Sequence, residues 1–179
     1  MKLNLGCGFN YRKDFVNCDL RQNLKADKHF DLNTFPYPFK ENSIDFILIS
    51  HVLEHLEDPI KVLKECHRIL KLNGELQVEV PYFASECAFA DIDHKHFFGI
   101  TTFNTITQKE KNHFRGPFNS LMNFEIINRR LIGRKFFKPL ENLINISYKT
   151  MRIYQELFCW ILPARAIKFN FIKKKLNQK

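Results

Sequence analysis

Long apolar runs, a leader-like start and paired cysteines are all missing from this sequence of 179 residues. No uninterrupted apolar stretch approaches the roughly 20 residues that a membrane-spanning helix needs. A secretory signal begins with a basic segment followed by an apolar one, and the first residues do not show this pattern. The five cysteines are scattered without a Cys-x-x-Cys pair, which disfavours a disulfide framework or a cysteine-rich zinc site. We therefore expect a cytoplasmic protein with reduced thiols.

Acidic side chains are scarce in the last third of the chain. Residues 129–179 hold 13 Lys and Arg against two acids, whereas residues 1–128 hold 15 bases and 17 acids. The net charge of +9 therefore originates in the C-terminal part. Such a concentration of positive charge can attract nucleic acid, anionic lipid or a phosphorylated substrate. A solvated, lysine-rich tail is the alternative.

What the sequence does contain is a succession of strands and helices. Apolar or alternating segments predict strands over residues 2–5, 15–20, 30–32, 43–50, 75–83, 124–132 and 166–172. Helical spacing predicts one helix from Pro59, N-capped by Asp58, to Asn73-Gly74, and another over residues 139–161. Residues 84–123 are expected to form a loop with a short helix. This order predicts an α/β sheet with mostly parallel strands, and the short first connections predict reduced N-terminal helices.

A glycine-rich turn follows the first predicted strand. Gly6 and Gly8 allow the backbone to bend sharply and a ligand to approach the main chain closely. Asp19, at the end of the second strand, is placed to accept hydrogen bonds from two ribose hydroxyls. A dinucleotide site usually has a third glycine and an acid roughly 20 residues beyond the turn. Here the acid follows sooner, so an ordinary tight turn is the alternative to a nucleotide site.

Residues 31–81 carry a more specific pattern, DLNTFPYPFKENSIDFILISHVLEHLEDPIKVLKECHRILKLNGELQVEVP. It combines an Asp-hydrophobic pair, a Pro-Phe segment, a Ser-hydrophobic-Asp strand, an LEHL turn, an E-x-x-R-hydrophobic-LK helix end and a strand ending in proline. Over about residues 3–103 the chain resembles the type-11 branch of class I S-adenosylmethionine-dependent methyltransferases. The resemblance implies a Rossmann-like sheet with an antiparallel last strand. It also implies one domain over residues 1–179, with a cofactor-binding core in 1–103 and an acceptor-side, basic and aromatic part in 104–179.

The same resemblance implies S-adenosylmethionine as cofactor, S-adenosylhomocysteine as product, and roles for matching residues. The glycine turn would line the methionine and ribose, Asp19 would bind the ribose diol, and Asp31 would accept from the adenine amino group. Ser50 and His51 would lie along the methionine end. Asn4 stands where the family usually has an acid, and it lacks the charge that assists ammonium binding. The expected cofactor-binding residues are Asn4, Gly6, Cys7, Gly8, Asp19, Leu20, Asp31, Leu32, Ser50 and His51.

Candidate catalytic residues follow the strand over residues 75–83. Methyl transfer mainly requires alignment of the acceptor, but a hydroxyl acceptor also benefits from a base. Asp91, His94 and His96 are the candidates, since a D-x-x-H segment often follows this strand in the resembling enzymes. A histidine is suited to take a hydroxyl proton near neutral pH. The alternative is that these histidines cap or orient the loop.

A metal site is conceivable at His51, Glu54 and His55. Some metal-binding methyltransferases carry a similar motif here with a later histidine, for which His94 and His96 are the candidates. Many relatives carry the LEHL segment without metal, so the expectation is that no metal binds.

We expect methylation of an oxygen on a small-molecule, glycan or lipid-linked acceptor. The segment Trp160-Ile161-Leu162-Pro163-Ala164 resembles a segment of small methyltransferases of glycan and lipid-linked sugar pathways. The protein would then be peripheral to an anionic membrane, with Arg129, Arg130, Arg134 and Lys135 as its basic contacts. The alternatives are an RNA methyltransferase, favoured by the basic C-terminal part, and a non-catalytic S-adenosylmethionine-binding partner subunit.

Overall fold

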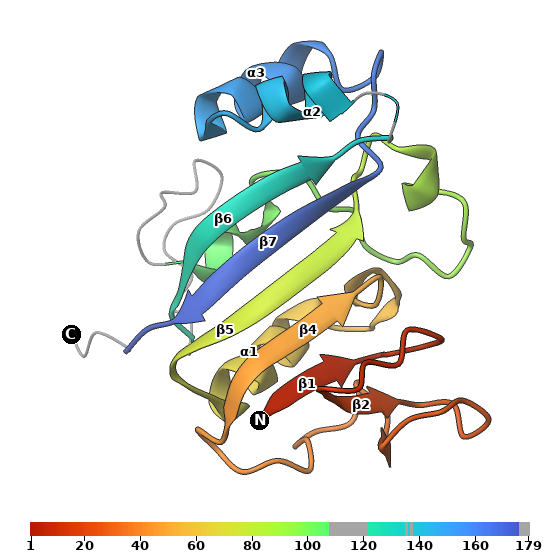
Figure 1. Ribbon diagram of the computed structural model, residues 1–179, viewed down its shortest axis with the longest axis vertical. Helices are drawn as coiled ribbons and strands as arrows, with labels where there is room; N and C mark the ends of the chain where they lie inside the picture. Colours follow the sequence, from red (N-terminus) through yellow and green to blue (C-terminus); the bar gives the residue numbers. More distant parts are fainter. Residues whose placement is uncertain (108–121, 135, 137, 176–179) are drawn as a thin grey trace.

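The computed structural model describes residues 1–107, 122–134, 136 and 138–175. Within these ranges the chain forms a seven-stranded sheet in the order β3-β2-β1-β4-β5-β7-β6 (Figure 1). The strands are β1 Lys2–Leu5, β2 Val16–Asp19, β3 Lys28–His29, β4 Ile44–Ser50, β5 Leu70–Pro81, β6 Phe124–Ile132 and β7 Ala166–Lys173. The helices are α1 Pro59–Ile69, α2 Lys138–Ile144 and α3 Tyr148–Leu157, with short 3-10 helices η1 Leu53–His55, η2 Glu86–Ala88 and η3 Thr102–Ile106.

Strand directions confirm the predicted sheet. β1 to β5 pair in parallel, and β7 pairs antiparallel with both β5 and β6. The chain first proceeds outward from β1 to β3 and then returns to place β4 on the other side of β1. Neighbouring strands whose connections leave in opposite directions create a crevice at their carboxyl ends, where open α/β sheets bind ligands. This topological switch point lies between β1 and β4.

Helices are unevenly distributed along the chain. Residues 1–50 are all described and contain no α-helix, which confirms the expectation of reduced N-terminal helices. The first helix, α1, begins as predicted: the Asp58 side chain accepts from the Lys61 N–H at 3.0 Å, and Pro59 occupies the first turn. Among the described residues, no helix is both long and apolar enough to span a bilayer.

Three predicted elements differ in their bounds. The third strand is Lys28–His29 rather than residues 30–32, because the main chain of Lys28–His29 pairs with Cys18–Asp19. The helix ends at Ile69 rather than at Asn73, since Leu70 already pairs with Ile44 of β4. The helix expected over residues 139–161 is two helices, α2 and α3, separated at residues 145–147. Residues 108–121 of the expected loop lie outside the described part.

One face of β5 and β7 forms part of the hydrophobic core. Leu76, Val78 and Val80 of β5 are buried, while the alternating Glu75, Gln77 and Glu79 are half-buried. The buried face of β7 packs on the ring of Phe103 from η3, through Phe169 at 4.8 Å and Phe171 at 5.5 Å between ring centroids. Both α1 and η3 lie behind the sheet in Figure 1. Polar side chains near the carboxyl edge therefore project from a well-packed support.

Candidate functional site

The glycine turn lies at the switch point, directly after β1. Gly6 and Gly8 both have positive φ, +67° and +53°. A Cβ on Gly6 would lie 2.4 Å from Cγ2 of Val52, in the segment after β4, whereas a Cβ on Gly8 would meet only the Arg21 side chain at 3.4 Å. Gly6 thus permits close packing of the two segments that form the crevice. The space beside Gly8 is open except for the end of the long, flexible Arg21 side chain.

Asn4 supports this turn from within the protein. Its Nδ2 donates to the Asn10 carbonyl oxygen and to Oδ1 of Asn17, both at 3.0 Å, and its side chain is buried. An aspartate, which the resembling family usually has here, could not donate these bonds when ionised. The described side-chain bonds of Asn4 therefore hold the turn. The sequence expectation placed this residue at the cofactor.

Asp19 lies beside the turn, as its position after β2 predicts. Its Oδ2 accepts from the Gly8 N–H at 2.7 Å, and its Oδ1 accepts from the Arg21 N–H at 3.0 Å and from Arg21 Nε at 3.3 Å. Burial alone would raise the pKa of Asp19, but these backbone bonds and the guanidinium hold the pKa below its ordinary value. The carboxylate is ionised at neutral pH. The half-exposed Arg21 side chain occupies the oxygen that a ribose hydroxyl would need.

Asp31 lies close to Asp19 on the same edge. The Phe30 N–H donates to the Asp19 carbonyl oxygen at 3.2 Å, which joins the two segments. Oδ1 of Asp31 accepts from the Asn33 N–H and from Asn33 Nδ2, while its Oδ2 accepts no hydrogen bond from the described residues. The neighbouring Leu32 is buried and its carbonyl accepts from the Tyr37 hydroxyl at 2.8 Å. The structure thus places Asp31 and its backbone beside Asp19 at the carboxyl edge.

Two apolar side chains next to the turn are exposed to solvent. Phe9 is 87% exposed and Leu20 is 60% exposed, although each adjoins a residue of the proposed cradle. The side chain of Cys7, in contrast, is buried and its Sγ lies toward the Lys25 carbonyl, so only its main chain can face a ligand. Exposed apolar surface, a carboxylate and an open glycine backbone are the groups that an adenosine requires. The residues present therefore fit the group.

His51, directly after β4, lies between two acids. Its Nδ1 is 3.4 Å from Oε1 of Glu54 and its Nε2 is 3.7 Å from Oε1 of Glu79, while its backbone adopts φ +54°. The charged contact with Glu54, followed by that with Glu79, raises the pKa of His51 to about 9. His51 is therefore mostly protonated at neutral pH and supplies a positive charge beside Ser50. The sequence analysis did not identify Glu79 as a partner of His51. The only signal for it was its position near the end of β5, where its side chain is half-buried.

The loop after β5 is fixed on η1 by its backbone. The N–H groups of Lys95 and His96 both donate to the Glu54 carbonyl oxygen, at 2.7 and 3.3 Å. Nδ1 of His94 lies 2.9 Å from the Ala88 carbonyl, and Nε2 of His96 lies 2.9 Å from the Leu56 carbonyl. These bonds place both histidines at the carboxyl edge.

The three expected catalytic residues differ in what they can do. His94 keeps Nε2 for another partner, because its contact with a carbonyl uses Nδ1. His96 uses Nε2 on a carbonyl instead. Asp91 is exposed and its Oδ1 accepts from the Asp93 N–H at 3.0 Å, so it shapes the turn of the loop. Of the three, His94 is best placed to act on an acceptor.

Glu54, His55 and His94 form a possible metal-binding group. Their ligand atoms all lie within 4.8 Å of one another. All three were candidates in the sequence, with His94 as one of the two histidines that could complete the site. His51, another candidate, lies between the carboxylates of Glu54 and Glu79.

The basic residues of the C-terminal part are partly neutralised. Arg130 pairs with Glu141 at 2.9 Å and Arg134 pairs with Glu86 at 3.0 Å, whereas Lys135 lies outside the described residues. The ring of Tyr148 stacks under the guanidinium of Arg129 at 4.6 Å. Next to these residues, β6, α2, α3 and residues 161–164 enclose a cavity of about 220 Å³. Its lining is mostly apolar and includes Leu140, Ile144 and Tyr154.

The order of strands, the reversed β7 and the glycine turn at the switch point together define the class I methyltransferase fold. Solved structures agree. A S-adenosylmethionine-dependent methyltransferase from Archaeoglobus fulgidus superposes with a TM-score of 0.63 at 16% identity, covering 97% of this chain and 85% of the other. A chain from a complex between the Haloferax volcanii Trm112 methyltransferase activator and a putative methyltransferase gives 0.56 at 14% identity, covering 97% and 82%.

Sequence relatives point to the same class. Residues 7–78 match the family described as methyltransferase domain. An uncharacterized protein of Methanocaldococcus jannaschii is 40% identical over 44% of this chain. A probable S-adenosylmethionine-dependent methyltransferase of Mycobacterium tuberculosis is 28% identical over 44% of it. The chain spans 39% and 35% of the length of these two relatives. The chain therefore has the fold of the class I S-adenosylmethionine-dependent methyltransferases, and its residues 7–78 are similar to the methyltransferase domain.

Proposed function

We propose that this chain binds S-adenosylmethionine in the crevice between β1 and β4 and transfers its methyl group to a hydroxyl acceptor. The observation that carries the proposal is the meeting of the glycine turn, Asp19 and Asp31 at the switch point of the sheet. When bound, the cofactor supplies an electrophilic methyl group on a sulfonium. The protein's own task is to hold donor and acceptor in line and to exclude water.

Each segment of the crevice has a separate task in this proposal. The Gly8 side of the turn accommodates the ribose and methionine, and Asp19 accepts from the ribose diol once Arg21 swings outward. Phe9 and Leu20 cover the adenosine with the apolar surface that they now expose. Asp31 accepts from the adenine amino group through its remaining oxygen. Ser50 and the protonated His51 lie along the methionine end.

His94 is the proposed proton acceptor. With a proton on Nδ1 donated to the Ala88 carbonyl, its Nε2 carries a lone pair that can take the proton of an acceptor hydroxyl. The acceptor oxygen then forms its bond to the methyl carbon as the carbon–sulfur bond breaks. The electron pair stays on sulfur, and S-adenosylhomocysteine is the product. A base of this kind contributes roughly 10² to 10⁴ in rate.

An apolar, glycan- or lipid-linked acceptor suits the C-terminal part. The cavity between β6, α2 and α3 has a mostly apolar lining with Arg134 at its wall. Arg134 pairs with Glu86, and the Ser85 hydroxyl donates to the Arg165 carbonyl at 3.0 Å, so the cavity region adjoins the segment after β5. Trp160 and Ile161 are exposed nearby, which supports peripheral contact with an anionic membrane. RNA as acceptor finds less support, because Arg130 and Arg134 are paired with acids.

Thermal unfolding with and without ligand tests the proposal. A ligand at about 100 times its Kd stabilises the folded state by roughly 2.7 kcal/mol. We expect S-adenosylmethionine and S-adenosylhomocysteine to stabilise the wild type and to lose this effect in Asp19→Ala. Asp14→Ala, an exposed acid of the same segment, is the matched control and should retain it. A wild type without any shift contradicts the proposal, and equal shifts in Asp19→Ala contradict the assigned ribose contact.

Transfer of a labelled methyl group identifies the acceptor class. Extracts would be incubated with the protein and labelled S-adenosylmethionine, then divided into organic-soluble, aqueous and nuclease-sensitive fractions. We expect label in the organic-soluble or glycan fraction, and less of it with His94→Ala. Label that nuclease releases would support the RNA alternative. Binding without any transfer would favour the non-catalytic partner subunit.

A further inference from the structure

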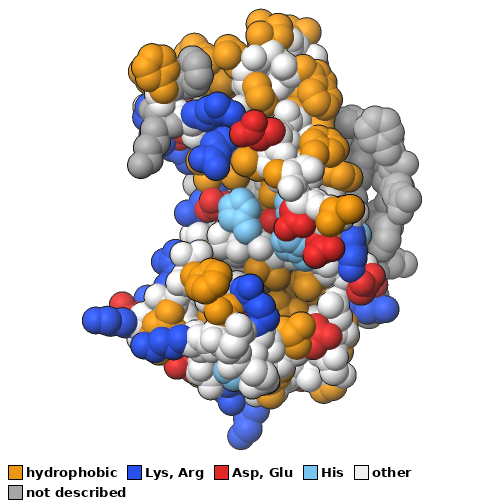
Figure 2. Space-filling view, turned by 90° about the vertical axis from the view of Figure 1, so that its right-hand side faces the viewer, with side chains coloured by type: hydrophobic (Ala, Val, Ile, Leu, Met, Phe, Trp, Pro, Cys, Tyr) orange, Lys and Arg blue, Asp and Glu red, His pale blue; other side chains and the backbone are white. Residues whose placement is uncertain are grey.

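Three metal-ligating side chains converge where η1 meets the loop after β5. Glu54 and His55 belong to η1 and His94 belongs to the loop. One ligand atom from each lies within 4.8 Å of the other two, and the rings of His55 and His94 are 4.6 Å apart between centroids. Figure 2 shows histidine and acidic side chains side by side near the middle of this face, which is the carboxyl edge of the sheet.

The carboxylate of Glu54 lacks hydrogen bonds although it is buried. The side chain is 1% exposed, and neither of its oxygens has a hydrogen-bond donor among the described residues. The imidazolium of His51 lies 3.4 Å from Oε1, which places a charge nearby without forming a bond. Buried carboxylates are costly unless hydrogen-bonded, paired or coordinated to a metal. His51 balances the charge of Glu54, but both carboxylate oxygens still lack hydrogen-bond donors among the described residues at the point where His55 and His94 meet them.

The orientation of His94 suits a metal ligand. Its Nδ1 contacts the Ala88 carbonyl at 2.9 Å, which leaves Nε2 for the ion. Metal-ligating histidines usually donate their other ring N–H to a carbonyl or carboxylate, which fixes the tautomer. His96, two residues further, has its Nε2 on the Leu56 carbonyl and is not part of the group.

The backbone brings the ligands together before any ion binds. Two N–H groups of the loop, those of Lys95 and His96, donate to the carbonyl oxygen of Glu54 itself. The segment that carries His94 is therefore joined directly to the residue that supplies the carboxylate. Little of the chain must be ordered when an ion enters, apart from small side-chain rotations.

We propose that Glu54, His55 and His94 bind one divalent transition-metal ion, with zinc, manganese and iron as the chemical class. Two imidazole nitrogens and one carboxylate suit these ions rather than magnesium or calcium. Metal–ligand bonds of about 2.0–2.2 Å require the side chains to approach one another somewhat more closely than they do now. Three protein ligands leave at least one coordination position for water or substrate. This proposal departs from the sequence expectation of no metal, and its ligand set keeps Glu54, His55 and His94 from the sequence candidates but leaves out His51.

The position of the site connects it with the acceptor. Both ligand segments follow the neighbouring strands β4 and β5 at the carboxyl edge, beside His51. An acceptor hydroxyl bound to the open position would be more acidic and would release its proton to water, because Nε2 of His94 would bind the ion instead of that proton. This consequence rests on the proposed function, whereas metal binding itself does not.

Metal binding can be measured without cofactor or acceptor. The full chain, stripped with a chelator, would be titrated with Co²⁺ and the visible absorption recorded, and Zn²⁺ would be titrated by calorimetry. We expect one ion per chain, with weakening of at least about 100-fold in Glu54→Gln and in His94→Ala, since even outer-shell changes cost 10- to 100-fold. His96→Ala is the matched control and should bind within about threefold of the wild type. Metal-free melting curves establish that each variant is folded.

The outcomes separate this inference from the proposed function. Absence of stoichiometric binding to the wild type at micromolar metal overturns the metal site, as does unchanged binding in folded Glu54→Gln or His94→Ala. Glu54→Gln keeps the size of the side chain and removes a buried charge, so it should fold even where His94→Ala does not. A positive metal titration with no shift by S-adenosylmethionine would support the site and contradict the methyltransferase proposal. A shift by S-adenosylmethionine without metal binding would support the methyltransferase proposal and contradict the metal site.

Discussion

Two buried polar residues organise opposite ends of this sheet in different ways. Asn17, in β2, is fully buried and holds the N-terminal turns with a neutral amide. Glu141, in α2, is 4% exposed and holds the C-terminal helices with a charge. The first region, residues 1–50, contains no α-helix of its own, and the second has two short ones. The comparison teaches that one buried side chain can hold several loop segments together when all of its hydrogen-bonding groups have partners.

The Asn17 centre uses every hydrogen-bonding group of its amide. Oδ1 accepts from Asn4 Nδ2 and from the Arg12 N–H, and Nδ2 donates to the carbonyls of Arg12 and Phe15 and to Oδ2 of Asp27, with distances of 2.9–3.1 Å. Among these partners, Asn4 holds the glycine turn, Arg12 and Phe15 precede β2, and Asp27 follows it. The glycine turn and the connections on both sides of β2 therefore depend on one neutral side chain.

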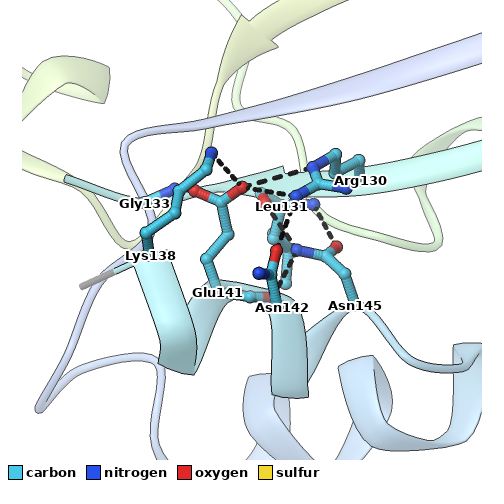
Figure 3. A network of polar contacts seen from close by, with 7 residues as sticks. All are labelled: Arg130, Leu131, Gly133, Lys138, Glu141, Asn142 and Asn145. Carbon is cyan, nitrogen blue, oxygen red and sulfur yellow. Dashed lines mark hydrogen bonds and ion pairs between the residues drawn. The ribbon is translucent and has the colours of Figure 1, made fainter. Parts of the chain in front are cut away.

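The Glu141 centre uses charge and an edge strand. Oε1 accepts from Arg130 and Lys138, and Oε2 accepts from the Gly133 N–H at 3.0 Å (Figure 3). Next to it, the amide of Asn145 accepts from the Leu131 N–H and donates to the Leu131 carbonyl, as a neighbouring strand would. β6 is the edge of the sheet, so this pairing covers main-chain groups that could otherwise bind another strand.

The largest effect is expected at the neutral centre. Asn17→Ala leaves the Asn4 amide and the Arg12 main chain buried without partners, which should cost about 3 kcal/mol of unfolding free energy. Urea unfolding measures the loss, and Asn23→Ala, an exposed asparagine of the next connection, should change stability by less than about 0.5 kcal/mol. A loss at Asn17 no greater than that at Asn23 would mean that its bonds do not hold the turns.

A smaller loss is expected at the charged centre. Glu141→Gln retains the size of the side chain but removes the charge that Arg130 and Lys138 share. Both basic side chains are about half-exposed, so water can replace part of the interaction. We expect a loss of about 1–2 kcal/mol, below that of Asn17→Ala. Glu156→Gln, which removes an exposed pair with Arg152, is the control and should have almost no effect. A loss above that at Asn17 would reverse the comparison.

Acid should weaken the charged centre first. Burial alone would raise the pKa of Glu141, but Lys138, Arg130 and the Gly133 N–H lower it below its ordinary value of about 4.5. A carboxyl with a lowered pKa in the folded state contributes stability above the unfolded pKa and loses it as pH falls through the folded pKa. The difference between wild type and Glu141→Gln should therefore shrink below about pH 4.5. The Asn17 side chain helps to lower the pKa of Asp27 below its ordinary value of about 3.8, so the difference between wild type and Asn17→Ala should stay constant until the pH falls below about 3.8. A difference for Glu141→Gln that does not shrink in acid would contradict the role of its charge.

Replacing Asn4 by aspartate, the residue that the resembling family usually has here, should disturb the Asn17 centre less than Asn17→Ala does. Asn4→Asp removes the donor to the Asn10 carbonyl and places a carboxylate beside Oδ1 of Asn17. We expect a loss of about 1 kcal/mol and no tighter binding of S-adenosylmethionine, because the side chain lies in the interior. Melting curves and ligand titrations of this variant measure both. Asn4→Gln would be the control that keeps the amide. A stable, tighter-binding Asn4→Asp would instead place this residue at the cofactor.

Local signals in the sequence predicted the class of the fold and part of the site. Strands with dense apolar patterns, the capped start of α1 and the position of Asp19 were predictable because neighbouring residues determine them. The end of α1 was not, since the pairing of Leu70 with Ile44 depends on a distant strand. The break at residues 145–147 likewise depends on Asn145 binding the main chain of β6, 14 residues away in sequence.

Within the site, the sequence missed contacts that only the fold creates. No local pattern relates Val52 to the absent side chain of Gly6, or Glu79 to His51. The sequence named His94 as a candidate to join Glu54 and His55, but it did not indicate the backbone bonds from Lys95 and His96 to Glu54 that bring the two segments together. Candidate site residues could therefore be named from their positions after strands, whereas the residues that they contact could not be predicted.

The smallest effect on stability, and the sharpest on binding, is expected at Arg21. Its guanidinium occupies Oδ1 of Asp19, but the side chain is about half-exposed, so Arg21→Ala should change the unfolding free energy by less than about 0.5 kcal/mol. Removal of this competitor should strengthen binding of S-adenosylmethionine a few-fold, since the carboxylate no longer has to release a partner. Calorimetric titration measures the affinity for S-adenosylmethionine, and the affinity of Arg21→Lys should fall between those of the wild type and Arg21→Ala. Weaker binding in Arg21→Ala would show that Arg21 assists the ligand, and that the cradle around Asp19 closes in another way.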